Sequence, residues 1–336
     1  MRGAAAFALA ISASVLVLGP ASAQSSTTGS APPLVPSAPA LAPAPAGQKA
    51  PALATAPGLT PASSSAAAPA GGAKTAAQCS NPNALGTSRT VEIDTTGGPG
   101  FGFEHFRQHD FLRDKEVVLT FDDGPWVSTP AVLKALANEC VKATFFMIGK
   151  HATYYPEIVR QVALAGHTVG SHTWSHQDLS RKTVDEAKAE IEKAISAVKW
   201  ALEDQGQESP FFRFPALRHP PELVTYLGER NIAIFSTDMD SFDFKMRKPD
   251  QVVKSVMAKL QKHGKGIVLM HDFQHATSEA VPQLLAELKA GGYKIVHMKA
   301  RGFVTSLPQY DEEMKKDTKL PTVSQRPTSS VVRDAD

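Results

Sequence analysis

Short apolar runs rich in β-branched and aromatic residues alternate with longer segments of helical periodicity between residues 115 and 297. The first run, Lys115 to Phe121, is apolar on both of its faces, as expected of a strand that is buried on both sides. In the longest helical segment, Val184 to Asp204, apolar residues recur every three or four positions, which predicts one buried face. The pattern predicts seven strands, at Lys115–Phe121, Ala143–Ile148, His167–Gly170, Phe211–Phe214, Ile232–Ser236, Gly266–Met270 and Lys294–His297.

The segments between these strands predict helices, at Thr129–Glu139, Pro156–Ala165, Val184–Asp204, Pro221–Arg230, Asp250–His263 and Ser278–Ala290. Strands that alternate with helices are usually joined as parallel β/α units, in an open doubly wound sheet or in a barrel. Polar residues favour the barrel, because they follow the C-terminal ends of successive strands, where β/α barrels carry their active sites. We predict an α/β fold, a distorted (β/α)7 barrel whose seven units leave a groove for a polymer.

The two ends of the chain differ in composition from the segment between them. Residues 1–23 combine one early positive charge, an apolar run and a small-residue ending, which predicts a secretory signal peptide cleaved near Ala23. Residues 24–78 are almost entirely Ala, Pro, Ser, Gly and Thr and predict a disordered linker. Residues 309–336 are polar without hydrophobic periodicity and predict a disordered tail. Residues 79–308 then form one domain with an N-terminal extension.

The predicted signal peptide places the protein outside the cytoplasm, either secreted or periplasmic. We expect no stable membrane insertion after cleavage, because no other segment is long and apolar enough to span a bilayer. The net charge of +2 is too small to indicate a nucleic acid partner. Cys79 and Cys140 are the only cysteines of the chain. Export favours a disulfide between them, although Cys140 could instead be a small buried apolar residue.

Two groups of polar residues carry the candidate chemistry. Asp122 and Asp123 directly follow the first strand, and such adjacent carboxylates either lie hydrated in a turn or surround a cation. His172 and His176, in S-H-T-W-S-H, could bind a divalent metal together with a carboxylate, or could be ordinary surface or core histidines. The zinc-protease pattern HExxH does not apply, because Thr, Trp and Ser separate the two histidines.

With these motifs the chain resembles the polysaccharide deacetylase family, carbohydrate esterase family 4. That family includes nodulation-type (NodB homology) chitooligosaccharide deacetylases and peptidoglycan deacetylases. Five motifs carry the resemblance in order: T-F-D-D-G-P at Thr120–Pro125, S-H-T-W-S-H at Ser171–His176, R-F-P-A-L at Arg213–Leu217, D-S-F-D-F at Asp240–Phe244 and L-M-H at Leu269–His271. The sequence departs from the family pattern at Ala216 and Leu217, which replace Tyr and Gly, and at Phe244, which replaces Trp.

The resemblance implies a role for each motif. Asp122 would be the general base, and Asp123, His172 and His176 would bind the metal. Arg213 would orient the base, and the backbone N–H of Ala216 would stabilise the oxyanion. His271 would be the general acid, and a nearby anion such as Asp240 would raise its pKa. The substrate-binding candidates are Leu269, Trp126, Trp174, Pro215 and Phe244, of which the two tryptophans could equally pack at the rim.

We therefore expect a metal-dependent hydrolase that removes N-acetyl groups from an N-acetylhexosamine glycan, either a chitooligosaccharide or peptidoglycan. Zinc is the default metal, and cobalt or nickel would also suit these ligand types. One alternative is an O-acetyl esterase that acts on xylan or an exopolysaccharide. The other is a non-catalytic glycan-binding module, which would need neither the base nor the acid. The sequence gives no indication of the oligomeric state.

Overall fold

The computed structural model describes residues 79–316, so the predicted signal peptide, the predicted linker and residues 317–336 of the predicted tail lie outside the described residues. All strand pairings within the described range are parallel. The strands are β1 (Thr87–Ile93), β2 (Gly100–Phe101), β3 (Glu116–Asp122), β4 (Thr144–Met147), β5 (Thr168–Ser171), β6 (Phe211–Phe212), β7 (Ala233–Phe235), β8 (Met239–Asp240), β9 (Gly266–His271) and β10 (Lys294–Ala300).

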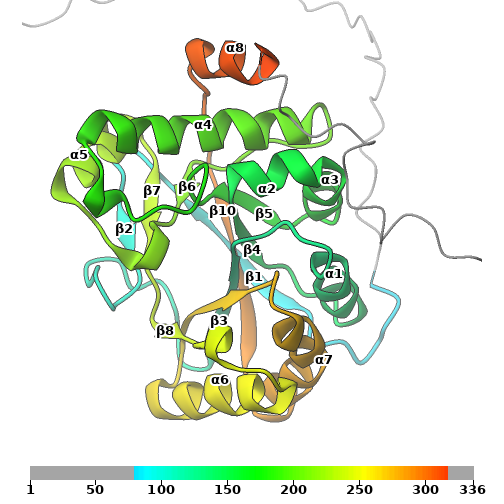
Figure 1. The fold of residues 1–336 in the computed structure, drawn as a ribbon. Coiled ribbons are helices and arrows are strands. Elements are labelled where there is room, and N and C mark those ends of the chain that lie inside the picture. The colour runs from blue at the N-terminus through cyan, green and yellow to red at the C-terminus, as the bar shows by residue number, and fades with distance from the viewer. Residues whose placement is uncertain (1–78, 317–336) are drawn as a thin grey trace, which may run out of the picture. The chain divides into compact units, whose positions relative to one another are not determined.

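Helices follow most of these strands and cover the outside of the sheet (Figure 1). They are α1 (Thr129–Asn138), α2 (Gly149–Tyr154), α3 (Pro156–Leu164), α4 (Val184–Leu202), α5 (Pro221–Glu229), α6 (Pro249–His263), α7 (His275–Ala290) and α8 (Pro308–Lys316). None of the helices in the described part is long and apolar enough to cross a membrane. All seven predicted strands are present, which confirms the α/β fold with a parallel sheet.

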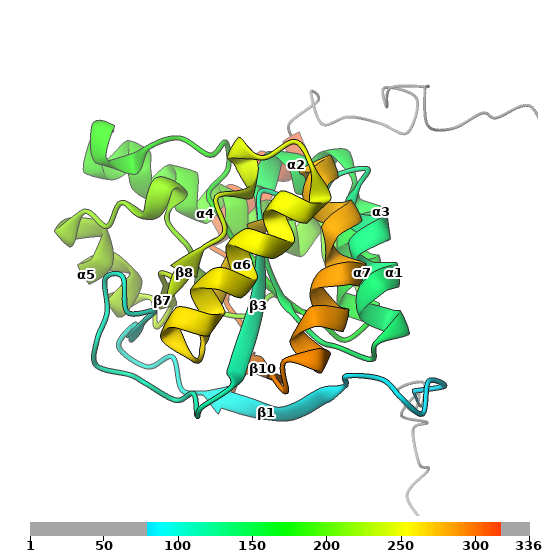
Figure 2. The same ribbon diagram turned by 90° about the horizontal axis from the view of Figure 1, so that it is seen from below.

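The strands curve into a distorted barrel around β3. On one side β3 pairs with β9, which pairs with β8, and on the other side the order runs β3, β4, β5, β6, β7, β2. No pairing joins β2 to β8 among the described residues, so the barrel is incomplete there. β10 pairs with the beginning of β3 and with β1, and Figure 2 shows β1 at the bottom of the view, below β3.

The alternation of side chains along β3 separates two parts of the core. Val117, Leu119 and Phe121 pack outward against helices such as α1 and α7, whereas Val118 packs inward with Phe146 of β4. Every residue of β3 is buried. Because both faces of the strand are covered, its polar end is held rigidly at the rim of the barrel. The predicted two-sided burial of this strand is therefore confirmed.

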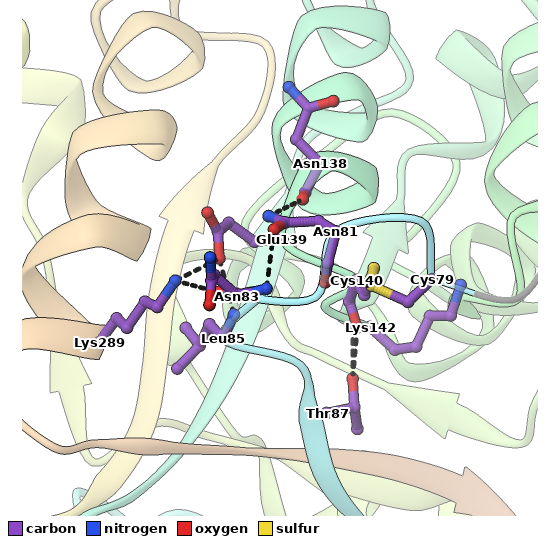
Figure 3. The surroundings of a disulfide bond; sticks show 10 residues. All are labelled: Cys79, Asn81, Asn83, Leu85, Thr87, Asn138, Glu139, Cys140, Lys142 and Lys289. Carbon is purple, nitrogen blue, oxygen red and sulfur yellow. Dashed lines mark hydrogen bonds and ion pairs between the residues drawn. A yellow bond between two sulfur atoms is a disulfide. The ribbon is translucent and has the colours of Figure 1, made fainter.

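The N-terminal extension, residues 79–114, is tied to the domain at several points. A disulfide joins Cys79 to Cys140, the residue that follows the end of α1 by two positions (Figure 3). The Asn81 side chain donates to the Asn138 carbonyl at 3.0 Å, and the Thr87 hydroxyl accepts from the Lys142 N–H at 2.8 Å. The extension also supplies β1 and β2, so it is an integral part of the barrel.

The prediction that disorder begins at residue 309 is wrong for residues 309–316, which belong to α8. Met314 of α8 is only 1% exposed. α8 lies against α4, where Glu313 pairs with Lys193 at 2.6 Å and Asp311 pairs with Lys199 at 2.8 Å (Figure 1). Only Leu307, Tyr310 and Met314 are apolar in this short, charged segment, too few to predict a helix, so contacts with α4 decide it.

Candidate functional site

A cavity of about 670 Å³ opens at the C-terminal ends of the strands. Residues at or just after the ends of β3, β5, β8 and β9 line it, together with the loop after β6. This is the end at which the sequence placed the candidate residues. Of the catalytic and metal-binding candidates, seven line the cavity: Asp122, Asp123, His172, His176, Ala216, Asp240 and His271.

Asp123, His172 and His176 form a compact cluster in this cavity. Asp123 Oδ1 lies 3.4 Å from His172 Nε2 and 3.2 Å from His176 Nε2. One ligand atom from each residue lies within 4.8 Å of the other two. Asp123 and His176 adopt left-handed backbone conformations, with φ of 68° and 55°. Such conformations are uncommon for residues other than glycine and often occur at functional sites.

The cluster fits a divalent cation. Asp123 Oδ1 is buried and has no hydrogen-bond partner within the described structure, and such an oxygen is costly without a charge to compensate it. His172 Nδ1 lies 2.7 Å from the Arg213 carbonyl, so this nitrogen carries the proton and Nε2 presents its lone pair to Asp123. Burial, and then the neighbouring His176, lower the pKa of His172 to about 3, which keeps the ring neutral. Two imidazoles and one carboxylate are a common ligand set of catalytic zinc.

Arg213 holds Asp122 beside this cluster. Its Nη1 donates to Asp122 Oδ1 and to the Thr120 hydroxyl, both at 2.7 Å. Its other nitrogens donate to the carbonyls of Phe235 and Ser236, at 3.2 and 2.9 Å. Arg213 is completely buried, so every part of its guanidinium is fixed. Burial raises the pKa of Asp122, while the charge of Arg213 opposes that rise.

His271 lies beside Asp122, its register partner on the neighbouring strand β9, and is bound to Asp243. Its Nδ1 and its backbone N–H contact the two carboxylate oxygens of Asp243, both at 2.7 Å. Burial alone would lower the pKa of His271, but the hydrogen bond and charge of Asp243, with the charges of Asp123 and Asp122, raise it to about 9. Thr277 donates to the same carboxylate at 2.6 Å.

Asp240, which the sequence suggested as this anionic partner, interacts with His271 through its charge alone, and the bonded anion is Asp243. Asp240 lines the cavity, but its carboxylate accepts the backbone N–H of Phe242 at 2.8 Å. Asp243 is the second aspartate of the same D-S-F-D-F stretch, so the motif contained the correct residue. The spacing of the two aspartates in the sequence did not indicate which one contacts His271, because β8 ends at Asp240 and a 3-10 turn begins at Asp243.

Asp272 and His151 support the D-D-G-P turn and were missed in the sequence. The His151 ring lies 2.7 Å from the Asp123 carbonyl. Asp272 is buried beside Gly124, where a Cβ atom would come within 2.4 Å of the Asp272 carboxylate and would displace it. Burial raises the pKa of Asp272 to about 7, with the charge of Asp123 contributing. Asp272 directly follows the L-M-H motif, and this position was the one sequence feature that pointed to it.

The predicted substrate-binding residues divide into two groups. Leu269 and Phe244 line the cavity, as does the backbone position Ala216, which has a φ of 52°. Trp126 and Trp174 do not line this cavity, and Pro215 is buried.

The two tryptophans pack against neighbouring side chains. Trp126 packs against the rings of His151 and Tyr155, at 5.0 and 5.3 Å. Lys193 of α4 lies 4.6 Å above the ring of Trp174.

Comparison with known proteins agrees with this arrangement. The family model described as polysaccharide deacetylase matches residues 110–233. A chitooligosaccharide deacetylase of Bradyrhizobium is 32% identical over 208 residues, which cover 60% of this chain and 92% of that protein. The chain belongs to the polysaccharide deacetylase family. The resemblance carried by the five motifs is thereby confirmed.

Two peptidoglycan deacetylases are also similar to this chain. A peptidoglycan-N-acetylglucosamine deacetylase of Listeria monocytogenes is 35% identical over 187 residues, which cover 54% of this chain. The matched part is 38% of the length of that relative. The solved structure of a Bdellovibrio bacteriovorus peptidoglycan deacetylase matches with a TM-score of 0.58 and 35% identity, over 64% of this chain and 59% of that one.

Proposed function

We propose that this protein is a metal-dependent N-deacetylase of an acetylated amino-sugar glycan. One observation carries the proposal: the Asp122–Arg213 pair and the His271–Asp243 pair face the Asp123–His172–His176 cluster within one cavity. The curated relatives named above act on peptidoglycan or on chitooligosaccharides. A binding module would need neither a buried base nor an acid, so the intact pairs support an enzyme.

Amide hydrolysis requires a base, an acid and a site for the developing negative charge. Asp122 takes a proton from the attacking water, whose oxygen bonds to the acetyl carbon. The Arg213 hydrogen bond keeps the carboxylate aimed at the cavity. The backbone N–H of Ala216 is the donor that we assign to the oxyanion. A divalent cation held by Asp123, His172 and His176 would supply a Lewis acid at this point.

His271 completes the reaction as the acid. Because Nδ1 faces Asp243, the proton available to the substrate is on Nε2, which lies 3.9 Å from Asp123 Oδ2. Nε2 gives this proton to the nitrogen of the sugar as the carbon–nitrogen bond breaks, leaving acetate and a free amine. A pKa of about 9 keeps the ring protonated at neutral pH, as a leaving amine requires.

We also propose that the protein acts outside the cytoplasm with zinc as its metal. The signal-peptide pattern of residues 1–23 supports export. The disulfide between Cys79 and Cys140 supports an oxidising compartment, because such bonds are rare in the cytosol. The two imidazoles and the carboxylate support zinc over harder ions such as magnesium.

The test uses the full chain with chitooligosaccharides and with purified peptidoglycan. Acetate and new free amine are measured together, before and after metal removal by a chelator and with zinc, cobalt or nickel restored. We expect equal amounts of both products with metal, and a loss of at least 100-fold in Asp122→Asn, in line with the usual effect of a general base. The exposed Asp114→Asn is the matched control. Acetate without amine would establish the esterase instead.

Metal binding has a readout of its own. Zinc should raise the melting temperature of the metal-free wild type but not that of His176→Gln, with the exposed His263→Gln as control. An equal rise in His176→Gln would show that zinc binds elsewhere.

A further inference from the structure

A wall of the cavity comes from the N-terminal extension, outside the residues matched by the family model. Glu104 and His105 line the cavity, although the match begins only at residue 110. They follow β2, which pairs with β7 in the register Gly100 to Ile234 and Phe101 to Phe235. The pairing brings this segment to the end of the barrel at which the catalytic residues lie.

Backbone contacts hold this segment independently of the Glu104 side chain. The Glu104 N–H donates to the Thr237 carbonyl at 3.0 Å, and the Phe103 N–H donates to Asp238 Oδ1 at 2.6 Å. Gly102 has a φ of +95°, and a Cβ there would lie 2.6 Å from the Thr237 nitrogen, so the chain turns closely against β7. Glu104 is exposed, and within the described structure its carboxylate has no hydrogen bond or ion pair with the protein.

His105 is fixed by its ring. Nδ1 lies 2.7 Å from the Ser236 hydroxyl, and the ring centre lies 4.4 Å from that of His219. His219 in turn packs on Phe214 at 5.1 Å, and Phe214 also lines the cavity. In the part of the chain that the structure describes, His105 Nε2 has no protein partner.

The chemistry of this wall suits a carbohydrate. A sugar ring presents hydroxyl groups at its edge and C–H groups on its faces, so it needs polar groups beside apolar ones. Glu104 and His105 supply the polar groups, and Phe214 and Leu217 supply apolar surface in the same cavity. Hydrogen bonds to a carboxylate are roughly twice as strong as those between neutral groups. The volume of about 670 Å³ falls in the range of sites that enclose a whole ligand, beyond the needs of an acetyl group.

We infer that Glu104 and His105 form a subsite for the hydroxyl groups of a second sugar unit, next to the unit that carries the reacting acetyl group. The inference rests on the proposed function, because it assumes a glycan in this cavity. It makes the substrate an oligomer or polymer, since a monosaccharide at the reacting position leaves the subsite empty. The N-terminal extension then determines substrate length, in addition to completing the barrel.

The first measurement is binding of tetra-N-acetylchitotetraose to the metal-free full chain by calorimetry. In Glu104→Gln the affinity should fall about tenfold, the effect of losing one charge-assisted hydrogen bond. The control Glu229→Gln removes an exposed carboxylate that does not line the cavity, and it should bind like the wild type. Equal affinity in Glu104→Gln and wild type, or no binding by the wild type, would overturn the subsite.

The second measurement compares kcat/KM for N-acetylglucosamine and for the tetrasaccharide in the metal-loaded protein. Glu104→Gln and His105→Gln should raise KM for the tetrasaccharide and leave kcat/KM for the monosaccharide unchanged. An equal loss on both substrates would show a structural effect transmitted through Ser236 and Arg213, and would contradict the subsite. If the wild type releases no acetate but Glu104→Gln still weakens binding, the proposed deacetylase activity fails, while the contact between Glu104 and the glycan stands.

Discussion

Replacing Asp243 with asparagine should move the basic limit of activity to lower pH. Asp243 is the main reason that the pKa of His271 rises from 6.5 to about 9, a rise of about 2.5 pH units. Without this anion the pKa should return toward 6.5. At pH 8 the protonated fraction of His271 would then fall about 30-fold, and the rate should fall with it if His271 is the acid.

The interaction between His271 and Asp243 also stabilises the folded protein, and this contribution depends on pH. Because the folded-state pKa is raised, protonated His271 stabilises the fold fully at pH values below 6.5, and the contribution is lost as pH rises through about 9. A rise of about 2.5 pH units corresponds to about 3 kcal/mol. In the metal-free protein, the free energy of unfolding of the wild type should therefore fall between pH 6.5 and 9, and that of Asp243→Asn should fall much less.

The assay is the pH dependence of kcat for acetate release, with the pKa of His271 measured by NMR in metal-free protein. Asp240→Asn is the comparison variant, because Asp240 lines the cavity without bonding to His271. We expect a much smaller change in that variant. A basic limit that stays near pH 9 in Asp243→Asn and moves in Asp240→Asn would refute the assignment.

Three further predictions concern stability, measured as the free energy of unfolding in denaturant. Arg213→Met leaves the Asp122 charge buried and unpaired and should cost about 3–5 kcal/mol, part of which Asp122→Asn should restore; full stability in the single variant would contradict the pairing. Reduction of the disulfide between Cys79 and Cys140, which are 61 residues apart, should cost about 4 kcal/mol, and a variant with alanine at both positions should not respond to reductant. Met314→Ala should cost about 2 kcal/mol, and no change would show that α8 does not pack on α4.

Much of the barrel could be predicted because its central strands are buried on both faces. β3 is a mainly apolar segment in which every residue is buried, and α4 repeats its apolar residues at helical spacing. The missed strands lack such signals. β1 alternates partly buried and exposed residues, and its most buried position is Ile93. β2 and β8 have two residues each, too few for a period. Their positions depend on neighbours that are distant in the sequence.

In the site, residues fixed by strand ends were predictable and residues fixed by packing were not. Asp123 directly follows β3, so its position follows from that strand. Trp126 and Trp174 have a chemistry that suits sugars, but their rings pack against His151 and Lys193. Glu104 had no motif or periodicity around it. Only the pairing of β2 with β7 brings it to the cavity.

The pairing of β1 with β10 has a consequence for the order in which the protein can be made. The Ser88 hydroxyl donates to the Ile295 carbonyl, 207 residues later in the chain. At 5–20 residues per second, synthesis of that stretch takes roughly 10–40 s, during which β1 has no strand to pair with. In the described part of the chain β10 is its sole neighbour. A nascent chain that ends before residue 294 therefore leaves β1 without its partner strand, and the β1–β10 pair can form only when synthesis is nearly finished.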